Sequence, residues 1–167
     1  MTTASRSDKK IAARFDSPQQ EVYLHLWRTY DRLKALEDEL FSQHQLSAQQ
    51  YNALRLLQLV HPDTVPTLAL GAKLVSRAPD ISRLLDKLAN RGLIIRDRRP
   101  ENRRVVQVGI TPAGMNLLRQ LEASVRQCHQ RQLGHLTETQ LRQLVELLNA
   151  ARQPHEDAEH PWPKWQQ

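Results

Sequence analysis

The stretch that decides the fold is "ISRLLDKLANRGLIIRDRRPENRRVVQVGITPAG", residues 81–114. Its first part carries four apolar residues at helical spacing: Ile81, Leu84, Leu85 and Leu88. This helix is expected to end at Gly92, a typical helix C-cap. Beyond it the apolar period shortens to about two residues, which predicts strands over 93–99 and 104–111. "PEN" between them has turn chemistry, so the stretch predicts a helix followed by a β-hairpin.

Capping signals predict further helices on both sides of this stretch. Their expected starts are Ser17 with Pro18, Ser47 with Gln50, Thr111 with Pro112, and Thr137 with Gln140. "HPDTVP", residues 61–66, interrupts the chain before a short helix "TLALGAKL" over 67–74. Apolar residues mark one face of the last helix: Leu141, Leu144, Val145 and Leu148. The order of elements is that of a mainly α (α+β) winged helix-turn-helix with a two-stranded wing.

The positive charge is concentrated on this same region. The chain of 167 residues has a net charge of +6, and residues 71–111 hold ten basic and four acidic residues, an equal excess. Five arginines fall within "RDRRPENRR", residues 96–104. Such a cluster is useful when phosphates neutralise it, which favours double-stranded DNA as the partner. The alternative is a solvated hairpin with surface Arg–Glu pairs. The wing lacks the exposed aromatics with which readers of single strands stack on bases.

The expected DNA contacts fall into three groups. The residues at the start of the recognition helix would face base edges: Arg77, Ala78, Pro79, Asp80, Ser82 and Arg83. Lys87, further along the same helix, is also an expected contact. Phosphate contacts are expected from Thr67, Lys73 and Ser76. The wing would contribute Arg96, Arg98, Arg99, Arg103 and Arg104. For Asp80 a second interpretation stays open, since a carboxylate in the first turn of a helix is favoured by the helix dipole alone. Pro79 either contacts a thymine methyl or only starts the helix.

These residues resemble the MarR family of bacterial transcriptional regulators. The family pattern reads L-x-x-x-G-L, an Arg, a wing P-x-D-R-R and V-x-L-T-x-x-G. Its counterparts here are residues 88–93, Arg96, "PENRR" and "VGITPAG". "LSAQQYNAL" also looks like the family's second helix, and the resemblance runs from about Pro18 to Leu148. The chain departs from the pattern at Asn102, where the family has an Asp that pairs with a wing arginine. The resemblance makes Arg103 the minor-groove arginine, with Arg104 beside it.

The resemblance implies a homodimer built from intertwined N- and C-terminal helices. The expected segments are a flexible basic arm (1–16), a dimerisation helix (17–45), the DNA-binding domain (46–111), dimerisation helices (112–153) and a flexible tail (154–167). The expected function is sequence-specific regulation of transcription, in the first instance repression, at a pseudo-palindromic operator. The competing class is a non-specific architectural DNA-binding protein. Either would act in the cytoplasm, associated with the nucleoid.

A small aromatic ligand is a further expected partner, because many similar regulators lose DNA affinity on binding one. Side chains that would line its pocket are Tyr23, Leu26, Trp27, Tyr30 and Tyr51, with His25 or Arg55 as polar anchor. The alternative is that these aromatics are ordinary core and dimer contacts. Cys128, the single cysteine, lies on the apolar stripe of its helix, which predicts buried packing rather than oxidant sensing.

Several other classes are not expected. No apolar run reaches the roughly 18 residues of a membrane span, and the N-terminus lacks the apolar core of a secretory signal. "HEDAEH" in the tail does not have the H-E-x-x-H spacing of a metal site. No cofactor and no enzymatic activity are expected, because the sequence has no Gly-rich phosphate loop and no nucleophile–base signature.

Overall fold

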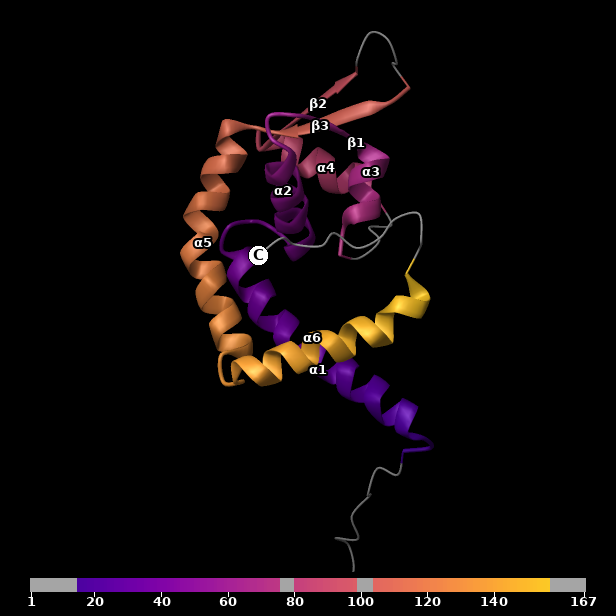
Figure 1. Ribbon diagram of the computed structural model, residues 1–167. Coiled ribbons are helices and arrows are strands. Elements are labelled where there is room, and N and C mark those ends of the chain that lie inside the picture. Colours follow the sequence, from indigo (N-terminus) through magenta and orange to yellow (C-terminus); the bar gives the residue numbers. More distant parts are fainter. Residues whose placement is uncertain (1–14, 76–79, 99–103, 157–167) are drawn as a thin grey trace, which may run out of the picture. The chain divides into compact units, whose positions relative to one another are not determined.

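The computed structural model describes residues 15–75, 80–98 and 104–156 (Figure 1). The chain forms two compact units, residues 1–35 and 36–167. The elements, in chain order, are α1 (Pro18–Ser42), α2 (Ala48–Val60), β1 (Val65–Pro66), α3 (Thr67–Lys73), α4 (Ile81–Asn90), β2 (Ile94–Arg98), β3 (Val106–Ile110), α5 (Pro112–Leu133), α6 (Glu138–Arg152) and the 3₁₀ turn η1 (Gln153–His155). The fold is a winged helix-turn-helix, as predicted, with α3 and α4 as the helix pair and β2–β3 as the wing.

The first unit contains the N-terminal part of α1, which begins where the sequence predicted. Ser17 caps it, because the Gln20 N–H donates to Ser17 Oγ at 3.1 Å. All residues from 21 to 32 are exposed. They include the rings of Tyr23 and Trp27, whose centroids lie 6.2 Å apart. This segment of helix therefore presents aromatic side chains on its surface.

The second unit has a hydrophobic core built from several elements. Its largest fully buried side chains come from α2, α4, β3 and α5: Leu54, Leu57, Leu85, Leu88, Val108 and Leu121. Burial of such a side chain typically stabilises a fold by about 1.5–3 kcal/mol relative to exposure. The core holds α4 by its apolar face and leaves the opposite face of that helix in solvent.

The ends of the helices follow the predicted capping chemistry. Ser47 with Gln50 and Thr137 with Gln140 both form complete capping boxes, and Thr111 caps α5. At the end of α4, Gly92 adopts the left-handed conformation with φ of 66°. The Leu93 N–H closes the turn by donating a hydrogen bond of 3.0 Å to the Leu88 carbonyl. This arrangement is a Schellman cap, so the predicted stop of the recognition helix is confirmed.

The sheet has one strand more than predicted. The two wing strands are antiparallel, with Ile94 opposite Ile110 and Arg98 opposite Val106. Within the predicted break "HPDTVP", Val65–Pro66 forms β1 and pairs with the other edge of β3. A proline is tolerated there because β1 is an edge strand. The wing is therefore tied at its base to the segment that leads into α3.

The two C-terminal helices differ from each other in their surroundings. The α5 stripe lies buried within this same chain: Leu118, Leu121, Val125 and Cys128. α6 has no buried residue, and Val145 and Leu147 are 57% and 68% exposed. Of the two helices, only α6 leaves its apolar face uncovered. Residues 153–155, close to the predicted start of the flexible tail, form a 3₁₀ turn beside an ion pair between Arg152 and Glu156.

Candidate nucleic-acid interface

The turn between α3 and α4 is anchored at both of its described ends. At its start the Val75 N–H donates to Asn52 Oδ1 on α2 at 3.2 Å. At its end the Asp80 carboxylate accepts from the Arg83 N–H at 2.9 Å and so caps α4. Residues 76–79 lie outside the described residues, and with them the predicted contacts Ser76, Arg77, Ala78 and Pro79.

The Asp80 contact decides part of an open question. The Asp80 carboxylate forms the N-cap hydrogen bond of α4, which supports its role in starting the helix. The helix dipole favours a carboxylate at this position as well. Contact between Asp80 and a cytosine stays a prediction. Sequence reasoning did not single out Asn52, because its bond to the turn depends on the packing of α2 against α3.

The exposed face of α4 is polar and carries two basic residues. Ser82, Arg83 and Lys87 are exposed, while Leu84, Leu85 and Leu88 on the other face are buried. Beside this face lies an open hollow of about 410 Å³ against the start of α2. Its lining includes Arg83 and Lys87. Asp80 also lines the hollow and Asp86 is exposed on α4, so the two cations share this surface with two carboxylates, of which Asp86 is paired with Arg96.

The wing arginines have different surroundings. Arg96 forms an ion pair with Asp86 of α4, and its side chain is only 25% exposed. Arg98 and Arg104 are exposed. Arg99 and Arg103 lie outside the described residues, as does Asn102. The sequence indicated a basic wing but missed the partner of Arg96, since the pairing requires β2 to lie against α4.

The two predicted phosphate contacts on α3, Thr67 and Lys73, also have different surroundings. Thr67 donates its hydroxyl to the Val106 carbonyl at 3.1 Å, which joins the start of α3 to β3. Lys73, in the last turn of α3, is exposed. Thr67 therefore has a structural bond of its own, whereas Lys73 faces solvent.

Two of the seven predicted ligand-pocket residues line one hollow. Tyr51 and Arg55 border an open space of about 310 Å³ between α2 and α5. The other lining residues are Gln58, Leu118, Arg119, Glu122, Arg126 and His129. Burial raises the pKa of Tyr51; Glu122 and Glu37 raise it further, and Arg55 opposes them. The five predicted residues of α1 belong to the first unit, where all are exposed: Tyr23, His25, Leu26, Trp27 and Tyr30.

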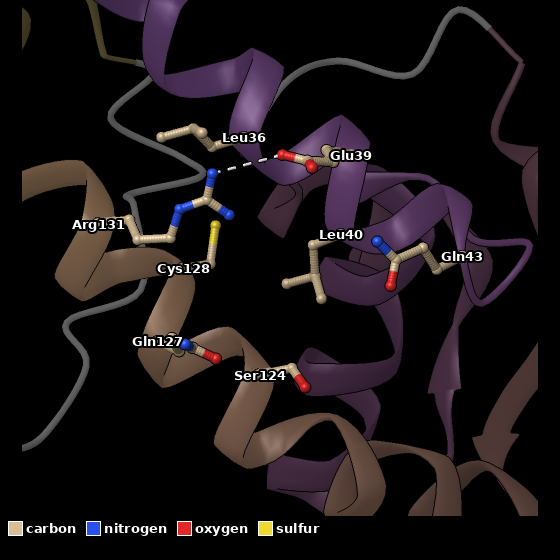
Figure 2. A pocket seen from close by; sticks show the side chains of 8 residues that line it. All are labelled: Leu36, Glu39, Leu40, Gln43, Ser124, Gln127, Cys128 and Arg131. Carbon is tan, nitrogen blue, oxygen red and sulfur yellow. Dashed lines mark ion pairs between the residues drawn. The ribbon is translucent and has the colours of Figure 1, made fainter.

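Cys128 lies at a third, smaller hollow (Figure 2). This space of about 180 Å³ is lined by Leu36, Glu39, Leu40, Gln43, Ser124, Gln127, Cys128 and Arg131. Arg131 and Glu39 form an ion pair of 3.6 Å across it. Residue Cys128 is 5% exposed, and burial raises the pKa of its thiol, as do Glu37 and Glu39, against the opposing charge of Arg131. The prediction of buried packing for Cys128 is confirmed.

The described residues contain neither a candidate metal centre nor a candidate membrane-spanning helix. No group of three or more His, Cys, Asp or Glu side chains in that part of the chain is placed to hold a metal ion. None of its helices combines the length and apolar character needed to cross a membrane.

Comparison with known proteins identifies the family of this chain. The model of the MarR family matches residues 46–106. The crystal structure of a MarR transcription factor from Planctomyces limnophilus is 58% identical and has a TM-score of 0.66, over 82% of this chain and 99% of that one. The chain belongs to the MarR family. The proteins of this family to which the chain is similar are transcriptional regulators, not enzymes.

Two other relatives are more distant from this MarR protein. The HTH-type transcriptional regulator MhqR of Bacillus subtilis (strain 168) is 29% identical over 98 residues, which cover 59% of this chain and 66% of MhqR. The chain thus spans about two thirds of the length of that relative. A mutant MarR from E. coli, complexed with operator DNA, is 21% identical with a TM-score of 0.70, over 78% of this chain and 93% of that one. At that identity the likeness shows the fold alone.

Proposed function

We propose that this MarR-family chain is a sequence-specific double-stranded DNA-binding regulator, acting as a repressor. The observation that carries the proposal is the coincidence of fold and charge. The recognition helix α4 and the wing fall within residues 71–111, the region that holds the whole +6 excess. A basic surface on a winged helix-turn-helix suits the phosphates on either side of a major groove. On this account the protein acts on chromosomal DNA in the cytoplasm.

The proposed contacts follow the geometry of α4 and the wing. Arg83, Ser82 and Lys87 would face the major groove, because they occupy the exposed side of the recognition helix. The wing would enter the adjacent minor groove with Arg103, whose role is carried over from the family, and Arg104. The pairing of Arg96 with Asp86 supports a different role for Arg96, in which it orients the wing on α4.

A homodimer is the assembly that we propose for binding. Two faces of the chain support it: exposed apolar side chains of α1, such as Tyr23 and Trp27, and those of α6, such as Val145 and Leu147. Burying such faces against a second copy would remove apolar surface from water. A two-fold dimer would present two α4 helices to an inverted repeat with half-sites about one helical turn apart.

Release by a small organic anion is the regulatory part of the proposal. The α2–α5 hollow has three arginines and one carboxylate on its wall, Arg55, Arg119, Arg126 and Glu122, around the ring of Tyr51. An excess of positive charge beside an aromatic ring fits an aromatic carboxylate. Benzoate is a suitable probe: it should lower DNA affinity in the wild type and have less effect on Arg55→Ala.

The proposal is tested by selection of DNA from a random double-stranded pool with the purified protein. We expect enrichment of an inverted repeat with half-sites one turn apart, bound by a dimer in sedimentation equilibrium. Arg103→Ala should weaken binding to the selected DNA, whereas Arg142→Ala, on α6, removes an arginine paired within its own helix and should not. A pool that shows no enrichment would instead support the architectural alternative.

A further inference from the structure

Arg91, the residue that follows α4, forms hydrogen bonds with the turn at the end of α1. The Arg91 guanidinium donates one hydrogen bond of 2.8 Å to the Gln45 carbonyl and another of 3.2 Å to the His44 carbonyl. Both carbonyls belong to the turn between α1 and α2. This turn lies at the C-terminal end of α1, where the helix dipole places partial negative charge. A fixed positive charge is favoured at that position, and two charge-assisted bonds hold it there.

Both partners in this contact are held firmly by their own backbones. On the α1 side Gln45 has a φ of 54°, and the Leu46 N–H closes the turn on the Phe41 carbonyl at 3.0 Å. On the α4 side the left-handed Gly92 closes the recognition helix directly after Arg91. The guanidinium therefore bridges two helix ends of defined geometry, separated by 46 residues in the sequence.

The same α4 turn is also fixed to the start of α5. Thr111 donates its hydroxyl to the Gly92 carbonyl at 2.7 Å, and its N–H donates to the Leu93 carbonyl at 3.1 Å. The first turn of α5 also approaches closely, since a Cβ on Gly114 would lie 2.3 Å from that Leu93 oxygen. Because these short contacts involve backbone atoms, the α4 turn has little freedom to move relative to α5. The longer Arg91 side chain makes the contact on the α1 side.

We propose that Arg91 is a positioning residue that sets the orientation of α4 with respect to the end of α1. The inference rests on the proposed function, in which two α4 helices must match two half-sites. Without the guanidinium, the α4 turn would keep its contacts with α5 and lose its link to the α1–α2 turn. The recognition helix would then tilt more freely while its own base-contacting residues stay unchanged. Arginine suits this role because its planar fork donates in two fixed directions, which the single ammonium of lysine does not.

The spacing between half-sites gives a readout that is specific to this role. An inserted base pair rotates one half-site by about a tenth of a turn and moves it along the duplex. Wild-type protein with a well-oriented α4 should bind the selected inverted repeat at least about tenfold more tightly than versions with one base pair added or removed. Arg91→Ala should lose most of this spacing preference and bind a single half-site as the wild type does. Arg91→Lys should lie between them.

Arg142→Ala is the matched control, because Arg142 is an exposed arginine whose ion pair is with Glu138 of its own helix. It should keep the full spacing preference. If Arg91→Ala does not fold, Arg91→Lys, which retains the charge, decides the question by the same readout. An Arg91 variant that melts at a lower temperature yet keeps the spacing preference of the wild type would overturn the inference alone. A wild type that selects no sequence would overturn the proposed function, and this inference with it.

Discussion

Arg96 of the wing strand β2 pairs with Asp86 of the recognition helix α4, ten residues earlier in the sequence. The pair is partly open to solvent, with the two side chains 25% and 58% exposed. Its energetic contribution is therefore modest, but its position is significant because it joins the two elements proposed to enter DNA. One of the five clustered arginines thus links the wing strand to the recognition helix.

A double-mutant cycle with Arg96→Ala and Asp86→Ala tests this pairing. We expect a coupling of about 0.2–1 kcal/mol in the free energy of unfolding, measured in urea, as for other solvent-exposed ion pairs. Both single variants should also weaken binding to the selected DNA. Asp97→Ala is the control, since it removes a carboxylate from the same strand that accepts from the Arg98 N–H. If Arg96 served only to bind phosphate, Asp86→Ala would release it and tighten binding.

Gly114→Ala and Gly92→Ala should both destabilise the protein, for different reasons. At Gly114 an added Cβ would meet the Leu93 carbonyl oxygen at 2.3 Å and Ile110 Cγ1 at 2.7 Å, so the start of α5 must shift. We expect a loss of about 1–3 kcal/mol from this overpacking. At Gly92 there is space, but φ is 66°, and the left-handed strain costs about 1–2 kcal/mol.

Replacing each glycine with Asn separates the two causes. Asn tolerates the left-handed region, so Gly92→Asn should recover part of the loss, whereas Gly114→Asn should be at least as unstable as Gly114→Ala. Thermal or urea unfolding of the four variants measures this. Equal effects of Ala and Asn at position 92 would contradict the conformational explanation.

Asp80→Asn and Asp80→Ala distinguish capping from base reading. Asn caps helices about as well as Asp, so we expect Asp80→Asn to keep the stability of α4 and Asp80→Ala to lose about 1 kcal/mol. If the carboxylate acts only as a cap, Asp80→Asn should also keep the sequence preference of the wild type in DNA selection. Relaxed preference at one base pair in that variant would show instead that Asp80 reads a base.

The Cys128 thiol should react slowly in the folded protein. Its burial and raised pKa leave little thiolate at neutral pH. A colorimetric disulfide reagent should label the native protein far more slowly than the protein in denaturant, and Cys128→Ala should not be labelled at all. Rapid labelling of native protein at neutral pH would show that the thiol is accessible and reactive.

The same raised pKa predicts how stability changes with pH. The unfolded chain loses the thiol proton first as the pH rises, because its pKa is the lower one. The contribution of Cys128 to stability is therefore complete at neutral pH and is lost through the alkaline range. Cys128→Ala should show a shallower alkaline loss of stability than the wild type in urea unfolding.

Local signals in the sequence predicted much of the fold. The caps at Ser47, Thr111 and Thr137 depend on neighbours a few residues away, and so does the left-handed Gly92. The change from helical to alternating spacing after Gly92 located both wing strands. These features were predictable because their physical causes lie within one or two turns of chain.

Features that depend on packing between distant segments were not predictable in this way. β1 is only two residues long and exists because β3 offers an edge to pair with. The helical spacing predicted the apolar stripe of α5, but periodicity does not identify the elements that cover it, and the stripe is buried within the chain. The roles of Asp86, Asn52 and Arg91 likewise appear only when the elements are placed together.

The central claim is sequence-specific recognition of DNA, and the specificity ratio at physiological salt tests it most directly. Fluorescence anisotropy would compare the selected inverted repeat with a scrambled duplex of equal length, across a salt series. We predict affinity for the selected DNA about a thousandfold or more above that for the scrambled duplex, with log affinity for both falling linearly with log salt. Equal, weak and strongly salt-dependent binding to the two duplexes would contradict the account and indicate a non-specific DNA-binding protein.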